Sequence, residues 1–297
     1  MSAPSACRWC SASLAGGKRL PGRIRCRDCG VATTSPWPTA AELDAAYAGP
    51  YRPAAGRFSG WGDALLRRSR GALATRLDEI APPGAVLDVG AGDGALLAAL
   101  RRRGRVAIGG ERDPAAPARV GGLEAEAGAE EWAAVVFWHS LEHLPDPAGT
   151  LAAAAERLRP EGVILIAAPN ADSLQARLFG RRWLALDPPR HLHHFTAESL
   201  VERLRALGLR IERVSYLRGG QVVFGWLHGL VAELPDHPDL YDAIRRPAAR
   251  FHRLSARRRL ATLLAGGLLL PLALLGTAAE VALRRGGTVY LEARSGA

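Results

Sequence analysis

The segment from Val86 to Gly104 constrains the fold of this chain more than any other. A short apolar run carries Asp88 and is followed by a glycine-rich turn, after which a stretch of Ala, Leu and Arg residues stops at Gly104. Glycines let the backbone turn sharply and approach a ligand closely. The start of a following helix offers unpaired N–H groups to an anion. The segment therefore predicts a strand, a ligand-binding turn and a helix, the opening unit of an α/β fold.

A second apolar run over residues 106–110 ends at Glu111, where a carboxylate suits the two hydroxyls of a ribose. The glycines at 90, 92 and 94 follow a G-x-G-x-G spacing, which is tighter than the G-x-G-x-x-G of dinucleotide-binding folds. Because the chain holds 33 glycines, a purely structural turn is the alternative interpretation of this spacing.

A buried strand is predicted over residues 133–138, and it runs directly into the polar sequence HSLEHLPDP. Asp146 followed by Pro147 is typical of a helix start, with an acidic N-cap and a proline at the first helical position. We expect this helix to continue through Leu158. Further strands are expected over 163–168, ending at Pro169-Asn170, over 209–217, and over 288–293 near the end of the chain.

The G-x-G-x-G turn after Asp88, with the order strand, LEHLPDP, helix, LRPEG, strand and PN, resembles class I S-adenosylmethionine-dependent methyltransferases, near the ubiquinone-type O-methyltransferases. The resemblance covers about Val86 to Leu217. It implies an α/β, Rossmann-like, doubly wound seven-stranded sheet with an antiparallel last strand, and S-adenosylmethionine as the cofactor. It implies cofactor contacts from Asp88, Gly90, Ala91, Gly92, Gly94, Glu111, Arg112, Trp138 and His139.

The sequence departs from the family pattern at two places. Ala133, after Trp132, stands where an Asp commonly precedes the fourth strand. No third strand is evident in 121–131, where an acid or amide would face the adenine ring, and Glu126 and Glu130 are the candidates there.

Histidines after two predicted strands are the candidate catalytic residues. Ligands of open α/β sheets bind at the carboxyl ends of the strands, where His139, Glu142 and His143 follow the strand 133–138. Methyl transfer is a displacement at a sulfonium methyl, so it needs an aligned nucleophile, and a hydroxyl or carbon acid also needs a general base. His139 is the first candidate for that base or for a residue beside the methyl donor.

Glu142 and His143 are candidates to orient this loop through hydrogen bonds or, as the resemblance to O-methyltransferases implies, to contact a divalent ion. A second histidine group, in the sequence RHLHHF, supplies His191 and His194 as candidate bases or substrate hydrogen-bond partners. The histidines of this group also allow a metal site. We predict that catalysis rests on His139, His143 and His191.

All four cysteines fall in one pattern near the N-terminus. Two residues separate the members of each pair, and fifteen residues separate the pairs Cys7/Cys10 and Cys26/Cys29. This spacing is typical of a tetrahedral four-thiolate zinc site, and a rubredoxin-like iron site is the alternative. Disulfides are not expected, because the N-terminus lacks the apolar run of a signal peptide. So short a segment cannot bury a core, so zinc would supply its folding free energy, with no open position for catalysis.

An uncharged apolar stretch from Leu260 to Ala279 lies between the last two predicted strands and is flanked by arginines, as in a membrane helix. A single crossing would separate the last strand from its sheet, and Pro271 interrupts the stretch. Both facts favour a re-entrant or interfacial hairpin broken at Pro271. A packed helix pair or an oligomer contact is the alternative.

The formal charge of +10 would suit nucleic acid or an anionic membrane surface. Lys18 is the only lysine and the arginine clusters are scattered, so the charge reflects an arginine-rich composition. Aromatic residues interleaved for base stacking are absent from these clusters. We therefore expect no nucleic-acid partner, a cytoplasmic location, and a peripheral contact of residues 260–283 with the inner face of the membrane.

The predicted organisation is a four-cysteine zinc ribbon (1–35), a helical linker or lid (36–83), a methyltransferase core (84–218), a hydrophobic helical insertion (219–286) and the last core strand (287–297). Thr39 and Glu42 predict a capping box in the linker. The predicted function is S-adenosylmethionine-dependent methyl transfer to an oxygen or carbon of a small-molecule, lipid-linked or glycan-linked acceptor. The alternatives are a non-enzymatic zinc-ribbon and membrane-docking adaptor with a degenerate methyltransferase core, and an RNA methyltransferase.

Overall fold

A mixed six-stranded sheet forms the centre of the computed structural model, which describes residues 4–48, 58, 61–110, 131–217, 221–247, 250, 252 and 254–296. The sheet has the order β5-β4-β6-β7-β10-β9. Its strands are β4 (Val86–Val89), β5 (Ala107–Gly110), β6 (Trp132–Trp138), β7 (Leu158–Pro169), β9 (Arg210–Ser215) and β10 (Thr288–Arg294). The strands β4 to β7 are parallel, and β10 runs antiparallel between β7 and β9. The α/β fold with an antiparallel last strand is confirmed. The seventh strand that the resemblance implies would fall in the region of residues 111–130, which lie outside the described residues.

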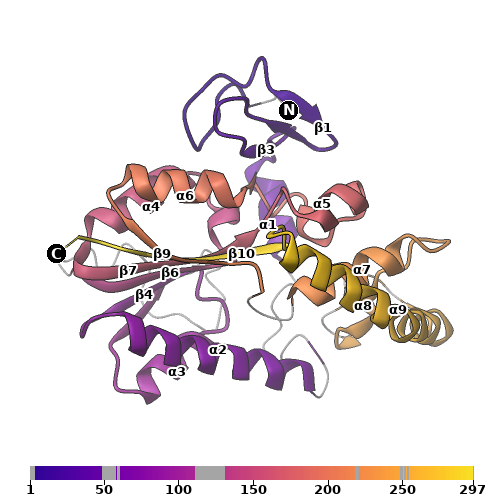
Figure 1. The fold of residues 1–297 in the computed structure, drawn as a ribbon. Helices are drawn as coiled ribbons and strands as arrows, with labels where there is room; N and C mark the ends of the chain where they lie inside the picture. The colour runs from indigo at the N-terminus through magenta and orange to yellow at the C-terminus, as the bar shows by residue number, and fades with distance from the viewer. Residues whose placement is uncertain are drawn as a thin grey trace.

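Helices cover both faces of this sheet (Figure 1). One face carries α2 (Trp61–Ile80) and α3 (Ala95–Arg102), and the other carries α4 (Pro147–Glu156) and α6 (Ala197–Ala206). Side chains alternate along a strand, so Val86 and Val136 belong to the core under α2 and α3, whereas Leu87 and Phe137 belong to the core under α4 and α6. Burial on both faces explains why these strands read as continuous apolar runs.

The helix α4 begins as predicted, because the Asp146 carboxylate accepts a hydrogen bond from the Gly149 N–H at 3.0 Å. Its expected continuation through Leu158 is wrong. The helix ends at Glu156, and Leu158 already pairs with Trp132 as the first residue of β7. Pro160 disfavours a helical conformation at the residue before it, which allows the strand to begin early.

The N-terminal ribbon shares a second sheet with the core. Its order is β1-β2-β3-β8, with β1 (Lys18–Leu20), β2 (Arg23–Arg25), β3 (Ala32–Thr34) and β8 (His193–His194). The strand β8 comes from the long segment after β7, so the ribbon is joined to the core by backbone pairing. The helix α1 (Ala40–Tyr47) follows the ribbon and begins with the predicted capping box of Thr39 and Glu42.

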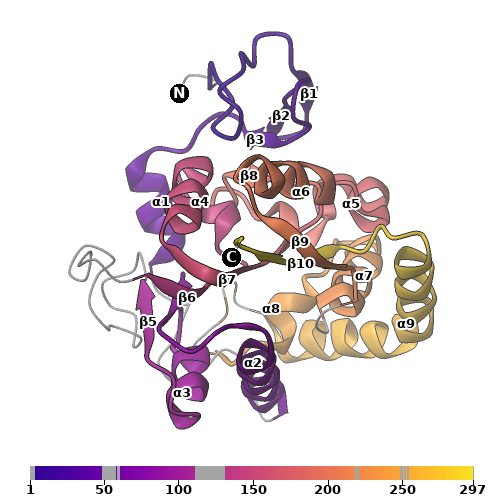
Figure 2. The ribbon, with the colours of Figure 1, turned by 60° about the vertical axis from the view of Figure 1, so that its left-hand side comes forward.

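A helical unit lies beyond the carboxyl end of β7 (Figure 2). It consists of α5 (Leu174–Phe179), α7 (Gln221–Ala232), α8 (Leu240–Ile244) and α9 (Ala256–Ala282). The predicted hairpin broken at Pro271 is wrong, because α9 is helical through Pro271. Figure 2 shows α9 bent along its length, as expected of a helix with an internal proline. The helices α7 and α8 pack against α9, with Leu240 of α8 near Gly266 and Trp226 of α7 near Gly276.

Candidate active site

The glycine turn follows β4 at the edge of the sheet where ligands of such folds bind. Gly90, Gly92 and Gly94 all have positive φ angles, of 81°, 62° and 70°, which is a conformation that side chains disfavour. The N–H groups of Gly90 and Ala91 donate to the Gly110 carbonyl at 2.8 and 3.1 Å, so the turn is tied to the end of β5. The helix α3 starts immediately afterwards. Asp88, at the end of β4, is only 3% exposed.

The glycine turn lies directly against the loop that follows β6. A Cβ atom added to Gly90 would stand 2.6 Å from the Cβ of Ser140, so only glycine fits there. Ser140 follows His139, whose φ of 52° is unusual for a residue with a side chain. Such conformations cluster at functional sites. Sequence reasoning missed Ser140, whose only signal is its position beside the candidate base.

A buried cluster of acidic and basic side chains surrounds Glu142, which is fully buried. The Glu142 carboxylate lies 3.5 Å from Nδ1 of His139 and 3.9 Å from Nε2 of His191. Within the described part of the chain, neither oxygen of Glu142 has a hydrogen-bond partner, and neither does Nε2 of His139. Buried polar atoms are normally paired, so this cluster is built to receive another group.

His143 and His191 are held in defined orientations beside Glu142. Nδ1 of His143 lies 3.0 Å from the Arg190 carbonyl, and Nδ1 of His191 lies 2.8 Å from the Ala185 carbonyl. When Nδ1 donates to a carbonyl, Nε2 carries the lone pair of a neutral imidazole. Ligand atoms of Glu142, His143 and His191 all lie within 4.8 Å of one another. The three residues could therefore hold a metal ion, with the carbonyls acting as its outer partners.

The charges within this cluster depend on burial and on the neighbouring side chains. Burial opposes ionisation of Glu142, but the interaction with His139 and the charges of the histidines outweigh it and lower the pKa of Glu142 to about 2. Burial lowers the pKa of His143 to about 4. At neutral pH His143 is therefore uncharged.

Two further side chains that the sequence did not single out complete this cluster. The Tyr47 hydroxyl, at the end of α1, lies 2.9 Å from Nδ1 of His143. The Asp187 carboxylate lies 3.7 Å from Nε2 of His191, and Arg190 pairs with it. Tyr47 lies far from His143 along the chain, and Asp187 lies in an irregular segment. No spacing pattern in the sequence therefore indicates either residue.

His193 and His194 belong to a strand that pairs with the ribbon. They form β8, are almost completely buried, and pair with the ribbon strand β3. Burial lowers the pKa of His193 to about 4 and that of His194 well below its usual value. Among the described residues, His191 belongs to the group of possible metal ligands with Glu142 and His143, and its ring also lies 6.4 Å from the His194 ring.

The remaining predicted cofactor residues lie at the end of β6 or outside the description. The Trp138 ring faces the Arg70 guanidinium of α2 at 5.0 Å and the Tyr290 ring of β10 at 6.3 Å. Arg70 gives no signal in the sequence, because it is one of many arginines. Glu111, Arg112, Glu126 and Glu130 lie outside the described residues.

The four cysteine sulfurs converge as the spacing predicts. The Sγ atoms of Cys7 and Cys29 are 3.6 Å apart, and those of Cys10 and Cys26 are 3.7 Å apart. Four sulfurs at the tetrahedral corners about 2.3 Å from zinc would be about 3.8 Å apart, so the residues fit the ion. A hydrogen bond from Cys29 lowers the pKa of the Cys7 thiol to about 5, which favours the thiolate that zinc binds.

The ribbon also contacts the segment that carries His191. The Thr34 hydroxyl donates to the His191 carbonyl at 2.7 Å, and the Thr34 N–H donates to the Leu192 carbonyl at 2.9 Å. The Trp9 ring packs on Phe195 at 4.8 Å, and its indole N–H donates to the Ser199 carbonyl. The ribbon is therefore part of the wall that positions the buried cluster.

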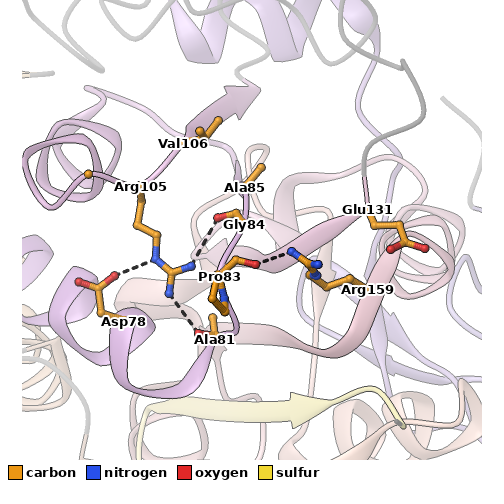
Figure 3. Close-up of a pocket in the computed structure, with 10 residues that line it drawn as sticks. Asp78, Ala81, Pro83, Gly84, Ala85, Arg105, Val106, Glu131 and Arg159 are labelled. Carbon is orange, nitrogen blue, oxygen red and sulfur yellow. Dashed lines mark hydrogen bonds and ion pairs between the residues drawn. The ribbon is translucent and has the colours of Figure 1, made fainter.

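A hollow at the opposite edge of the sheet has a structural explanation (Figure 3). It lies at the amino ends of β4 and β5, away from the glycine turn. Arg105 lines it and donates to the Asp78 carboxylate and to the carbonyls of Pro82 and Ala81 at 3.0, 2.5 and 3.0 Å. Arg159 likewise donates to the Pro83 carbonyl. These guanidiniums satisfy loop carbonyls, so the hollow is no candidate for the active site.

The core of this chain is similar to known methyltransferases. A family model described as a methyltransferase domain matches residues 60–214. The ubiquinone biosynthesis O-methyltransferase of Hahella chejuensis is 33% identical over 130 residues, which cover 37% of this chain and 54% of that protein. The protein of the same description from Saccharophagus degradans is 30% identical over 153 residues, which cover 43% of this chain and 64% of that protein. This chain thus spans less than two thirds of the length of each of these relatives.

Matches among solved structures include a SAM-dependent methyltransferase from Archaeoglobus fulgidus, with 15% identity and a TM-score of 0.41 over 76% of this chain and 94% of that one. The plantazolicin methyltransferase BpumL, in complex with SAH, has 12% identity and a TM-score of 0.45 over 80% of this chain and 86% of that one.

Proposed function

Because the chain belongs to the methyltransferase domain family, we propose that it transfers a methyl group from S-adenosylmethionine to a small-molecule or lipid-linked acceptor. The observation that carries this proposal is the close contact between the glycine turn and the loop after β6. Gly90 lies against Ser140, so a cofactor bound at the turn would lie beside His139.

The reaction that this arrangement supports is a direct displacement. A nucleophilic atom of the acceptor attacks the sulfonium methyl, the bond between sulfur and methyl carbon breaks, and S-adenosylhomocysteine leaves. When the nucleophile is a hydroxyl, its proton must go to a base. Nε2 of His139 is buried and has no hydrogen-bond partner among the described residues, while Nδ1 faces Glu142 at 3.5 Å. His139 is therefore the base in this proposal, and Glu142 orients its ring and stabilises the proton it gains.

Glu142, His143 and His191 also fit a divalent metal ion. Both Glu142 oxygens lack hydrogen bonds within the described chain, and both imidazoles have Nδ1 fixed on a carbonyl. When bound, such an ion would lower the pKa of an acceptor hydroxyl. The residues of this chain would still align the acceptor and exclude water around it.

Oxygen is the acceptor atom that we favour over carbon. The two relatives are described as O-methyltransferases of ubiquinone biosynthesis, and the core residues around the glycine turn belong to the matched region. A hydroxyl also makes full use of the buried His139–Glu142 pair, since its proton must be removed during the reaction.

Transfer of a radioactive methyl group from S-adenosylmethionine into small phenols and into lipid extracts tests this proposal. We expect His139→Gln to lower kcat by a factor of about 10² or more and to leave the affinity for S-adenosylhomocysteine close to that of the wild type. An exposed histidine replaced in the same way, His252→Gln, is the control. Equal kcat values for His139→Gln and the wild type would remove His139 from the role of base.

A further inference from the structure

On the surface helix of a soluble protein, apolar side chains usually face the core and polar ones face solvent. The helix α9 shows the reverse arrangement. The residues turned toward the protein are small or polar, and Thr262, Ala273, Thr277 and Glu280 are all buried. The large apolar residues turned outward are leucines. We define the outer face of α9 as Leu260, Leu264, Leu268, Leu272 and Leu275, which are 49% to 82% exposed. Intervals of four residues place Leu260, Leu264 and Leu268 along one side of the helix before Pro271, and Leu272 and Leu275 lie on the part after it.

The outer face of α9 is more apolar than the solvent-exposed surface of a typical soluble protein. The helix is long and apolar enough to cross a membrane, with a mean hydropathy of 2.0 over its most apolar stretch, yet only 22% of that stretch is buried. A core helix of a soluble protein would be mostly buried. A continuous apolar surface of this kind marks a site of interaction with a partner or a membrane.

Both ends of α9 are attached to the rest of the protein by hydrogen bonds. Near its start, the Arg259 guanidinium donates to the Ala243 carbonyl of α8 at 2.9 Å. At its end, the Glu280 carboxylate accepts hydrogen bonds from the N–H groups of Gln175 and Gly287 at 2.7 and 3.1 Å. The flanking strands β9 and β10 pair with each other. A helix held in this way cannot cross a bilayer, but it can lie in its interface.

The charges around the outer face select the kind of partner. Exposed arginines stand at both ends of α9, namely Arg257 and Arg258 at the start and Arg284 and Arg285 at the end. Cations beside an apolar surface suit anionic headgroups that surround acyl chains. A second copy of the chain would bring the same arginines together in either orientation of two α9 helices, and like charges in an interface are unfavourable.

We propose that the outer face of α9 docks this protein on a bilayer that contains anionic phospholipid, with the helix in the plane of the membrane. The proposal does not depend on methyl transfer, since it rests on α9 alone. It would place the carboxyl edge of the sheet, which adjoins the helical unit, close to the membrane surface.

The test is co-sedimentation of the zinc-loaded chain of 297 residues with vesicles of phosphatidylcholine alone or mixed with phosphatidylglycerol. We expect binding to the mixed vesicles and weaker binding to the neutral ones. The variant Leu264→Gln/Leu268→Gln removes two outer leucines and should lower the partition coefficient by about tenfold or more. The control Leu65→Gln/Val106→Gln removes two side chains that are 67% and 61% exposed elsewhere, and should bind like the wild type.

A second variant separates charge from apolar contact. Arg284→Gln/Arg285→Gln should weaken binding to the anionic vesicles by about fivefold per arginine and should leave binding to neutral vesicles unchanged. Equal binding of the leucine variant and its control would overturn the proposal, and so would a folded wild type that binds neither kind of vesicle. A dimer in sedimentation experiments that is lost in the leucine variant, without vesicle binding, would assign the face to a second copy instead.

Discussion

The N-terminal ribbon and the helical unit around α9 both extend the central sheet, but they are attached in different ways. The ribbon joins the core through backbone pairing of β3 with β8 and through the buried Trp9 ring, and its cysteines converge on one point. The helical unit is attached by side chains on one face of α9, and its other face is left exposed. The difference indicates that the ribbon supports the core and its buried cluster, whereas α9 presents a surface for contact with something outside the molecule.

The first prediction concerns zinc, which should account for the largest effect. We expect Cys26→Ser to lose the bound ion and to unfold the ribbon, because zinc sites of this kind contribute about 10 kcal/mol or more to folding. Zinc content by mass spectrometry and limited proteolysis will check this, with cleavage expected in residues 4–35 while α9 stays protected. A variant that keeps zinc and resists cleavage would show that the cysteines do not hold the ribbon together.

The second prediction concerns the attachment of α9. Glu280→Ala should lower the free energy of unfolding by about 3 kcal/mol, because it leaves the buried N–H groups of Gln175 and Gly287 without an acceptor. Urea denaturation followed by circular dichroism will measure it. Glu202→Ala, on the solvent side of α6, is the control and should stay within about 0.5 kcal/mol of the wild type. Equal losses in the two variants would mean that Glu280 does not anchor the helix.

The third prediction tests whether the ribbon serves the active site. Thr34→Val removes the hydroxyl that donates to the His191 carbonyl at 2.7 Å but preserves the shape of the side chain. One neutral hydrogen bond contributes about 1 kcal/mol, so kcat for methyl transfer should fall about fivefold, while the Kd for S-adenosylhomocysteine stays the same. A change in Kd without a change in kcat would place the ribbon's influence at the cofactor instead.

The fourth prediction has the smallest expected effect. It compares the change in stability caused by a substitution on the outer face of α9 with that caused by one in the ribbon. Leu268 is 82% exposed, so Leu268→Gln should change the free energy of unfolding by less than about 0.5 kcal/mol. Trp9→Ala, which empties a buried site in the ribbon, should destabilise it by about 3 kcal/mol or more. Thermal denaturation of both variants provides the comparison. A large loss for Leu268→Gln would mean that the outer face of α9 is packed in solution.

Local patterns in the sequence predicted much of this architecture. The glycine turn, the caps at Thr39 and Asp146 and the cysteine pairs depend on residues close in the chain, and the structure contains each of them. Pairing of β3 with β8 could not be predicted, because it joins distant two- and three-residue segments with no periodicity. The helix through Pro271 was missed for a related reason. Its continuity depends on packing against α7 and α8 rather than on its own propensity.

The residue types of the candidate site could be predicted from the sequence, but only part of their spatial arrangement could. Because HSLEH directly follows the predicted strand, the sequence placed His139, Glu142 and His143 on one loop. The approach of His191 to them depends on the fold of a long irregular segment. The orientation of each imidazole ring by a carbonyl depends on tertiary structure, as does the contact of Tyr47 with His143.

Calorimetric titration of the zinc-loaded protein with S-adenosylhomocysteine tests the central claim most directly. We predict micromolar binding by the wild type and by Glu202→Gln, and loss of binding in Asp88→Asn, whose buried carboxylate lies at the end of the strand before the glycine turn. Absence of binding in the folded wild type would contradict the account and favour an adaptor built on a methyltransferase core. Equal binding by Asp88→Asn would contradict the placement of the cofactor at the glycine turn.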